Sequence, residues 1–129
     1  MEIEIFDSKS IKHRRVNGAA LSVNVKGRFE INKTAVETLN LEDGCKISFV
    51  HDKKNPRDWY LFRDPNGVNT RVYSKTGSLL FNSMQLRKLI YESIGSPDAK
   101  NGKMRFAIAT QPTQHKEMIM YAILTSKLL

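Results

Sequence analysis

The chain has 129 residues, 40% of them hydrophobic, which suits a single domain with one ordinary core. Its 21 Lys and Arg residues outnumber 13 Asp and Glu residues, and the net charge of +8 favours a polyanionic partner such as nucleic acid. One cysteine cannot form an internal disulfide, and no apolar run reaches the roughly 18 residues that would cross a bilayer, so we expect a cytoplasmic protein without membrane contact.

The N-terminal residues predict a short strand and then a basic loop. Over residues 1–6, Ile alternates with Glu at the period of two that is typical of a strand. Residues 9–15 contain four Lys or Arg side chains, and Asn17-Gly18 closes the loop with a turn signal. Residues 9–33 hold seven Lys or Arg and one Glu, a net +6, so this segment is the best electrostatic candidate for phosphate contact.

Residues 21–31 predict a β-hairpin, because apolar and polar residues alternate on both sides of Lys26-Gly27. We expect a two-residue turn at that dipeptide. Asn32 is a good N-cap for a short helix over residues 34–41. The glycine in the turn at residues 42–44 is expected to end this helix by adopting a positive φ.

The rest of the chain predicts six more strands and a second helix. This helix is capped by Asn82 or Ser83, places apolar residues at helical spacing and stops at Gly95. Residues 51–58 and 111–117 are expected to be loops, because polar and charged residues dominate them. The expected strands are residues 45–50, 59–63, 69–74, 78–81, 104–110 and 118–124.

A short pattern occurs twice in the chain. Residues 26–32 align without a gap on residues 76–82, and each copy has a turn glycine, an apolar segment and a final Asn. The copies divide a single domain of residues 1–129 into units over about 19–64 and 69–125. We therefore predict an α+β, mainly β fold, in which two strand-strand-helix-strand-strand (ββαββ) units form a pseudo-twofold barrel or sheet with two helices.

No pattern of residues indicates catalysis. The three histidines lie in separate polar loops and lack the spacing of metal ligands. Neither a Gly-rich phosphate loop nor a nucleophile elbow is present in the sequence. Cys45 begins an apolar strand, where a buried small hydrophobic residue is expected rather than a nucleophile. We predict that the protein is not an enzyme and needs no metal or cofactor.

Nucleic-acid binding is favoured by three groups of side chains. The basic loop and the first hairpin turn would dock on phosphates electrostatically. Residues 57–75 mix aromatic rings with cations, and the period of two places Arg71, Tyr73 and Lys75 on one strand face, where they would suit single strands. The second helix adds two cations. The candidate residues are Lys12, Arg14, Arg15, Lys26, Arg28, Arg57, Tyr60, Arg63, Arg71, Tyr73, Lys75, Arg87 and Lys88.

Four segments of the first unit carry a family resemblance. They are residues 26–32, 35–41, 43–44 and 46–49. These segments contain a Gly-Arg turn, an apolar strand, a short helix and an acidic-Gly pair before the next strand. This arrangement resembles the AbrB-like (SpoVT/AbrB) DNA-binding family. Asn32 stands where the family has proline, and Asn40 stands where it has glycine.

The AbrB-like resemblance implies a swapped-hairpin barrel made from two units, which one chain with two copies could build internally. It also implies a role in transcription regulation and DNA contact by Arg28, which falls on the turn arginine of the family. Val36 and Glu37 stand where the family has a pair of helix arginines. Arg87 and Lys88 lie close to that place in the second unit.

Two other interpretations stay open. Residues 75–82, which lead into a helix, look like part of the whirly-type transcriptional coactivators, a resemblance that implies binding of single-stranded DNA or RNA by strand residues. Alternatively, sheet edges together with Met104, Met118 and Met120 would suit a protein-assembly module. The sequence leaves open whether the nucleic acid is single-stranded or duplex, and whether the protein is a homodimer.

Overall fold

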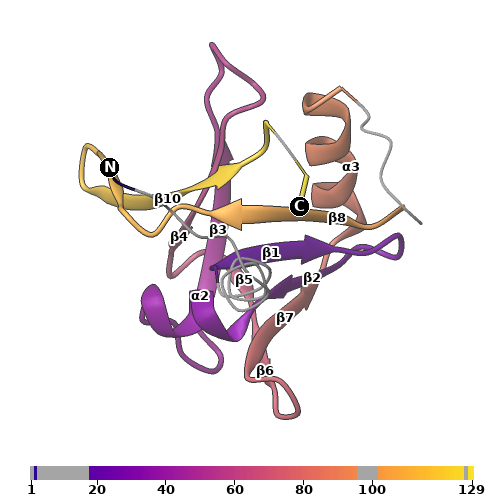
Figure 1. Ribbon diagram of the computed structural model, residues 1–129, viewed down its shortest axis with the longest axis vertical. Coiled ribbons are helices and arrows are strands. Elements are labelled where there is room, and N and C mark those ends of the chain that lie inside the picture. The colour runs from indigo at the N-terminus through magenta and orange to yellow at the C-terminus, as the bar shows by residue number, and fades with distance from the viewer. Residues whose placement is uncertain (1, 3–17, 96–101, 127) are drawn as a thin grey trace.

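The computed structural model describes residues 2, 18–95, 102–126 and 128–129, which form ten strands and two helices (Figure 1). The elements are β1 (Ala20–Val23), β2 (Arg28–Ile31), α2 (Lys33–Thr38), β3 (Lys46–His51), β4 (Trp59–Arg63), β5 (Val68–Asn69), β6 (Arg71–Tyr73), β7 (Ser78–Asn82), α3 (Met84–Ser93), β8 (Met104–Ile108), β9 (Thr113–His115) and β10 (Met118–Leu124). The strand predicted at residues 1–6 and the basic loop at 9–15 lie outside the described residues. Within the described part, neither helix is long and apolar enough to cross a membrane.

The strands form one antiparallel sheet that nearly closes into a barrel. Their order is β5-β3-β4-β10-β8-β1-β2-β7-β6, and β9 pairs with β10. β5 and β6 stand at opposite ends of this order, yet only Thr70 separates them in the chain. The buried Thr70 hydroxyl donates to the carbonyl of Cys45 at 2.7 Å. The prediction of one regular strand over residues 69–74 is therefore corrected, because the strand bends at Thr70 and changes its partner from β3 to β7.

Inward side chains from alternate strand positions build the core of the barrel. Phe29 and Phe81 stack with ring centroids 4.6 Å apart, and Phe49 tilts against Phe29 at 5.8 Å. Helix α3 lies along one side of the barrel (Figure 1), where the indole N–H of Trp59 donates to the Ser93 hydroxyl at 2.7 Å. Because strand residues alternate between the two faces of the sheet, the residues next to these phenylalanines along each strand point outward.

The first hairpin turns through three residues, Val25 to Gly27, and not through the predicted two. The Gly27 N–H donates to the carbonyl of Asn24, and the Asn24 N–H donates to the carbonyl of Arg28, both at 3.0 Å. The Asn24 side chain accounts for the longer loop, because its Oδ1 also accepts the N–H groups of Lys26 and Arg28. Gly27 completes the turn with φ at +82°, which a glycine adopts without strain.

Helix α2 begins at the predicted Asn32 cap, whose Oδ1 accepts a first-turn N–H at 3.0 Å. It ends at Thr38, earlier than predicted. Asn40 takes φ +54°, and the Leu41 N–H donates to the carbonyl five residues before it at 2.9 Å, which closes the helix with a Schellman motif. The prediction that Gly44 ends the helix is wrong. Asn40 ends it, because Asn tolerates this left-handed conformation better than most other residues that have a side chain.

The second half follows the prediction more closely. Ser83 caps α3, and its Oγ accepts the Leu86 N–H at 3.1 Å. Gly95 follows the end of α3 with φ +86°, as a stop signal should. The expected loop over residues 111–117 is partly wrong, because it contains β9, which pairs with the first residues of β10 to form a short hairpin.

Candidate nucleic-acid interface

Five neighbouring strands each contribute one side chain to a row across the sheet, and this row includes the buried Leu80. Arg105 of β8 lies opposite Ser22 of β1, and Ser22 lies opposite Glu30 of β2. Glu30 in turn lies opposite Leu80 of β7, and Leu80 lies opposite Arg71 of β6. We call this surface of β8, β1, β2, β7 and β6 the outer face. Two arginines therefore stand at the ends of a row that has one carboxylate at its centre.

A recess of about 180 Å³ lies in the outer face. It is lined by Ser22, Asn24, Arg28, Glu30, Tyr73 and Lys103, and we call it the sheet recess. The guanidinium carbon of Arg28 lies over the Tyr73 ring, 5.5 Å from its centroid. Such a cation–π contact is worth about 0.5–1 kcal/mol at an exposed site. It joins β2 to β6 across β7, so two of the predicted site residues, Arg28 and Tyr73, meet in one place.

The carboxylate of Glu30 is held by a short chain of hydroxyl groups. Ser78, which is 2% exposed, donates from Oγ to Glu30 Oε2 at 2.9 Å. Thr76 donates from Oγ1 to Ser78 Oγ at 2.8 Å. The chain orients one oxygen of the carboxylate and so fixes Glu30 in the lining of the recess.

Two arginines of the outer face are positioned by packing. The Nε atoms of Arg28 and Arg105 are buried, and neither has a hydrogen-bond partner among the described residues. A buried donor without an acceptor costs about 1–3 kcal/mol, so such groups are uncommon in folded proteins.

Lysines in two hairpin turns extend the positive charge. Lys26 is exposed in the β1–β2 turn and Lys75 is exposed in the β6–β7 turn. Since β2 and β7 run antiparallel, the turns that precede them lie at opposite ends of this strand pair. Three further predicted residues, Lys12, Arg14 and Arg15, lie outside the described part of the chain.

Arg87 has a structural role that the sequence did not reveal. Its Nε donates to the carbonyl of Asn24 at 3.0 Å, and its Nη2 donates to the carbonyl of Gly102 at 2.9 Å. The guanidinium also lies over the ring of Tyr91 at 5.4 Å. Arg87 therefore ties α3 to the first hairpin turn and to the start of β8. The neighbouring predicted residue, Lys88, is exposed on α3.

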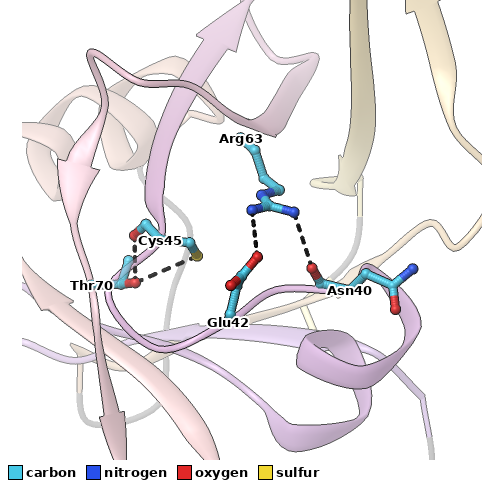
Figure 2. Close-up of polar contacts among 5 residues, drawn as sticks. All are labelled: Asn40, Glu42, Cys45, Arg63 and Thr70. Carbon is cyan, nitrogen blue, oxygen red and sulfur yellow. Dashed lines mark hydrogen bonds and ion pairs between the residues drawn. The ribbon is translucent and has the colours of Figure 1, made fainter.

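Arg63 is bound to protein acceptors as well. Figure 2 shows its guanidinium between Glu42 and Asn40, with Nη2 2.8 Å from Glu42 Oε1 and Nη1 donating to the Asn40 carbonyl at 3.3 Å. The same view shows Cys45, whose Sγ lies 3.7 Å from the Thr70 hydroxyl. The Arg63 pair fastens the end of β4 to the turn after α2, and an exposed pair of this kind contributes about 0–1 kcal/mol.

The aromatic and basic residues over 57–75 do not form one surface. Trp59 is buried in the core, whereas Tyr60 points outward on β4, opposite Ala122 of β10. Arg57 is exposed in the loop before β4, at the other end of that strand from Arg63. Tyr60 lines a separate recess of about 410 Å³. The fold therefore does not form a single stacking surface from this segment.

Two histidines, His51 and His115, line one recess, although the sequence predicts them in separate loops. His51 ends β3, His115 ends β9, and both line the recess of about 410 Å³ together with Tyr60. The ring of His51 lies 4.8 Å from that of Trp59. Within the described ranges, no group of three or more His, Cys, Asp or Glu side chains is arranged to hold a metal ion.

Sequence reasoning missed two cations of the outer face, Lys103 and Arg105. Residues 103–107 alternate basic or small residues with buried apolar ones, a pattern that indicates one outward face. That alternation could have identified both residues. It could not have shown that β8 lies beside β1, which brings Lys103 into the same recess as Arg28.

The comparisons with known proteins add no family or relative to these observations. No protein-family profile matches the sequence, and no curated protein or solved structure matches it either. A functional assignment must therefore come from the residues of the outer face and of the other recesses.

Proposed function

We propose that this protein is a non-enzymatic DNA-binding protein, acting in transcription regulation, whose outer face docks on the phosphate backbone. The observation that carries the proposal is the meeting of Arg28, Tyr73 and Lys103 in one recess, although these residues come from three distant parts of the chain. Arginine and lysine side chains donate to phosphate oxygens and to base edges in such complexes, and tyrosine rings are surfaces on which bases stack.

The spacing of the cations suits a strand of nucleic acid. Arg105 on β8 and Arg71 on β6 are four strand spacings apart, which corresponds to roughly 19 Å across the sheet. Phosphates of one DNA strand recur about every 3.4 Å of helix axis, so the row spans about five of them. Arg28 on β2 lies between its ends, and Lys103 directly precedes β8, the strand of Arg105. Several phosphates could be neutralised at once without movement of the backbone.

We also propose that the barrel consists of two ββαββ units related by a pseudo-twofold axis, as the AbrB-like resemblance implies. The β2–β7 register supports this architecture. Phe29 pairs with Phe81 and Ile31 pairs with Leu79, on either side of the pair Glu30 and Leu80. The sequence repeat aligns Phe29 with Leu79 and Ile31 with Phe81. A twofold rotation through the central pair would therefore exchange the two strands and keep their register.

The contacts of the two hairpin glycines support the same architecture. A Cβ on Gly27 would lie 2.7 Å from Sδ of Met84, the first residue of α3. A Cβ on Gly77 would lie 3.2 Å from Cδ of Lys33, the first residue of α2. Each hairpin turn thus packs against the helix that belongs to the other proposed unit, which is the exchange that a swapped-hairpin barrel requires.

The proposal is tested by removing three cations of the outer face. The variant Arg71→Gln with Lys75→Gln and Arg105→Gln is titrated against labelled single-stranded and duplex oligonucleotides by fluorescence anisotropy at two salt concentrations. Each lost phosphate contact lowers the slope of log affinity against log salt by about 0.7–0.9, so we expect a slope lower by about two to three units.

A matched control carries the same loss of charge elsewhere. Lys46, Lys53 and Lys54 are exposed and do not line the sheet recess, and their replacement by Gln should change the slope much less. If both variants lower the affinity equally, binding depends on net charge alone and not on the outer face. If the parent protein binds neither oligonucleotide at low salt, the proposed function is wrong.

A protein-assembly module is the second candidate, and an apolar groove of about 490 Å³ favours it. The groove is lined by Leu41, Phe62 and Ile119, and Ile119 is 57% exposed. Asp64 also lines the groove, and its pKa is lowered by the backbone N–H of Asn66 and then by the Ser48 hydroxyl. In light scattering, a salt-resistant oligomer that Ile119→Asp converts to monomer would support assembly over nucleic-acid binding.

A further inference from the structure

We propose that the sheet recess accepts one unpaired nucleobase that carries an amine beside a ring carbonyl, namely cytosine or guanine. This inference rests on the proposed function, and it adds a base-reading site to a surface that otherwise contacts phosphates. The recess measures about 180 Å³, below the range of about 300–1,000 Å³ for pockets that hold drug-sized ligands. Its size therefore favours a single planar group over a whole nucleotide.

Glu30 argues against a phosphate inside the recess. It is the one carboxylate among the described residues of the lining, and Ser78 holds it there by donating to Oε2 at 2.9 Å. A phosphate at contact distance from this carboxylate would meet a like charge in a partly desolvated site, which is strongly unfavourable. The arginines at the ends of the row across the sheet, Arg71 and Arg105, do not line the recess and so can hold the flanking phosphates.

The lining combines an acceptor with donors, and this combination selects among bases. Glu30 can accept hydrogen bonds from an amine, whereas Arg28 and Lys103 can only donate to a carbonyl or ring nitrogen. Asn24 Oδ1 already accepts two backbone N–H groups, so its amide can only donate as well. Thymine has no amine for Glu30. The carbonyl of cytosine or guanine has two lone pairs and can accept from both cations, whereas each ring nitrogen of adenine can accept only one hydrogen bond.

The aromatic side of the recess suits an unpaired base. The planar guanidinium of Arg28 lies over Tyr73, and both groups are surfaces on which bases stack in complexes with single strands. A base within a duplex has its pairing edge occupied and its faces stacked, so it cannot enter a concave site. The recess therefore predicts that base preference is seen with single strands and is absent with the matched duplex.

The test measures binding of the full chain to four labelled strands. Each is an oligothymidine of about 15 nucleotides, a length within the footprint of small single-strand binding domains, with its central base kept or changed to cytosine, guanine or adenine. A good base contact corresponds to at least about a fivefold change in affinity. We expect the cytosine or the guanine strand to bind at least that much more tightly than the thymine and adenine strands, and the two arms identify which base it is.

The variant Glu30→Gln separates base reading from general binding. Its amide no longer presents two acceptor oxygens, so the ratio of the affinities for the preferred strand and the all-thymine strand should fall towards one. The affinity for the all-thymine strand itself should stay equal or rise, because a negative charge is lost. Glu37→Gln is the control, since it removes the same charge from an exposed site on α2, 3.9 Å from Lys33. This control should keep the preference of the parent protein.

Each remaining outcome decides the inference. Equal binding of all four strands by the parent protein, or a preference that survives Glu30→Gln, would overturn the base-reading site and leave the proposed nucleic-acid binding intact. Absence of binding to every strand at low salt would overturn the proposed function itself. A variant that fails to fold is recognised because it also loses the all-thymine strand.

Discussion

Gly67 directly precedes β5, an end strand of the sheet. Its N–H donates to the carbonyl of Asp64 at 2.8 Å, and the next residue, Val68, pairs with Ile47 of β3. A Cβ on Gly67 would lie 2.5 Å from the carbonyl carbon and oxygen of Ile47. These contacts are with backbone atoms, which cannot move aside as the end of a flexible side chain could. The lack of a side chain at this residue is therefore required by the close approach of the chain to β3.

We expect Gly67→Ala to lower the free energy of unfolding by about 1–3 kcal/mol, the usual cost of forcing extra atoms into a packed site. The measurement is urea-induced unfolding followed by tryptophan fluorescence. Gly18→Ala is the matched control, because a Cβ there would meet no atom of the described residues within 4 Å, and its stability should stay near that of the parent. Equal stability of the two variants would show that the contact with Ile47 does not require glycine at residue 67.

Helix α3 is joined to the rest of the barrel by a charged side chain as well as by apolar contacts. Arg87 donates to the carbonyls of Asn24 and Gly102, so it connects the helix to the first hairpin and to β8. Replacing it by Met removes two charge-assisted hydrogen bonds, each worth about 1.5–3 kcal/mol, and leaves two half-buried carbonyls without this donor. Lys88, one residue further on, is exposed.

We therefore expect Arg87→Met to lower the melting temperature clearly, and Lys88→Met, which removes the same charge, to leave it within about 2 °C of the parent value. Both are measured by circular dichroism. The pair also separates two roles for this helix, because loss of a phosphate contact in Lys88→Met would lower the salt slope of DNA binding without a change in stability. Similar melting temperatures for the two variants would show that the Arg87 contacts do not hold the helix.

The whole molecule has one core to which both halves contribute. Phe29 and Phe49 come from the first half, and Phe81, which stacks on Phe29, comes from the second. Strand pairs β1–β8, β2–β7 and β4–β10 each join the two halves. Neither half can expose its apolar surface to water while the other stays folded, so the two halves should unfold together.

We expect a single unfolding transition in urea, with the same midpoint whether the fluorescence of Trp59 or the far-ultraviolet circular dichroism is followed. Trp59 is a suitable probe because it is 4% exposed and bonded to Ser93 of α3. Two separated midpoints would show that the halves are independent units. That result would also argue against the exchange of hairpins proposed above.

Features that depend on neighbouring residues could be predicted from the sequence. Alternation indicated the two strands of the first hairpin, and Asn32 acts as the predicted helix cap. Helix α3 was recognised by its apolar spacing and by Gly95 at its end. Each of these features is set by side chains within a few residues, so a local pattern is sufficient to predict it.

Local rules failed where two candidate residues could each satisfy the same signal. Both Asn40 and Gly44 adopt a positive φ, and the hydrogen bond of Leu41 shows that Asn40 is the one that ends α2. In the same way, the side chain of Asn24 lengthens the first hairpin turn, although Lys26-Gly27 satisfies the rule for a two-residue turn. Competition between local hydrogen bonds decided both cases.

The candidate site depends on contacts between residues that are far apart in the sequence. The bend at Thr70 takes the chain from one end of the sheet to the other, and the pairing of β1 with β8 brings Lys103 into the same recess as Arg28. Charge, hairpin strands and helix ends follow from neighbouring residues, since propensity and alternation act over a few positions. Which strands become neighbours depends on the burial of one shared core, and that is why only the folded chain brings together the cations, Tyr73 and Glu30 in one recess.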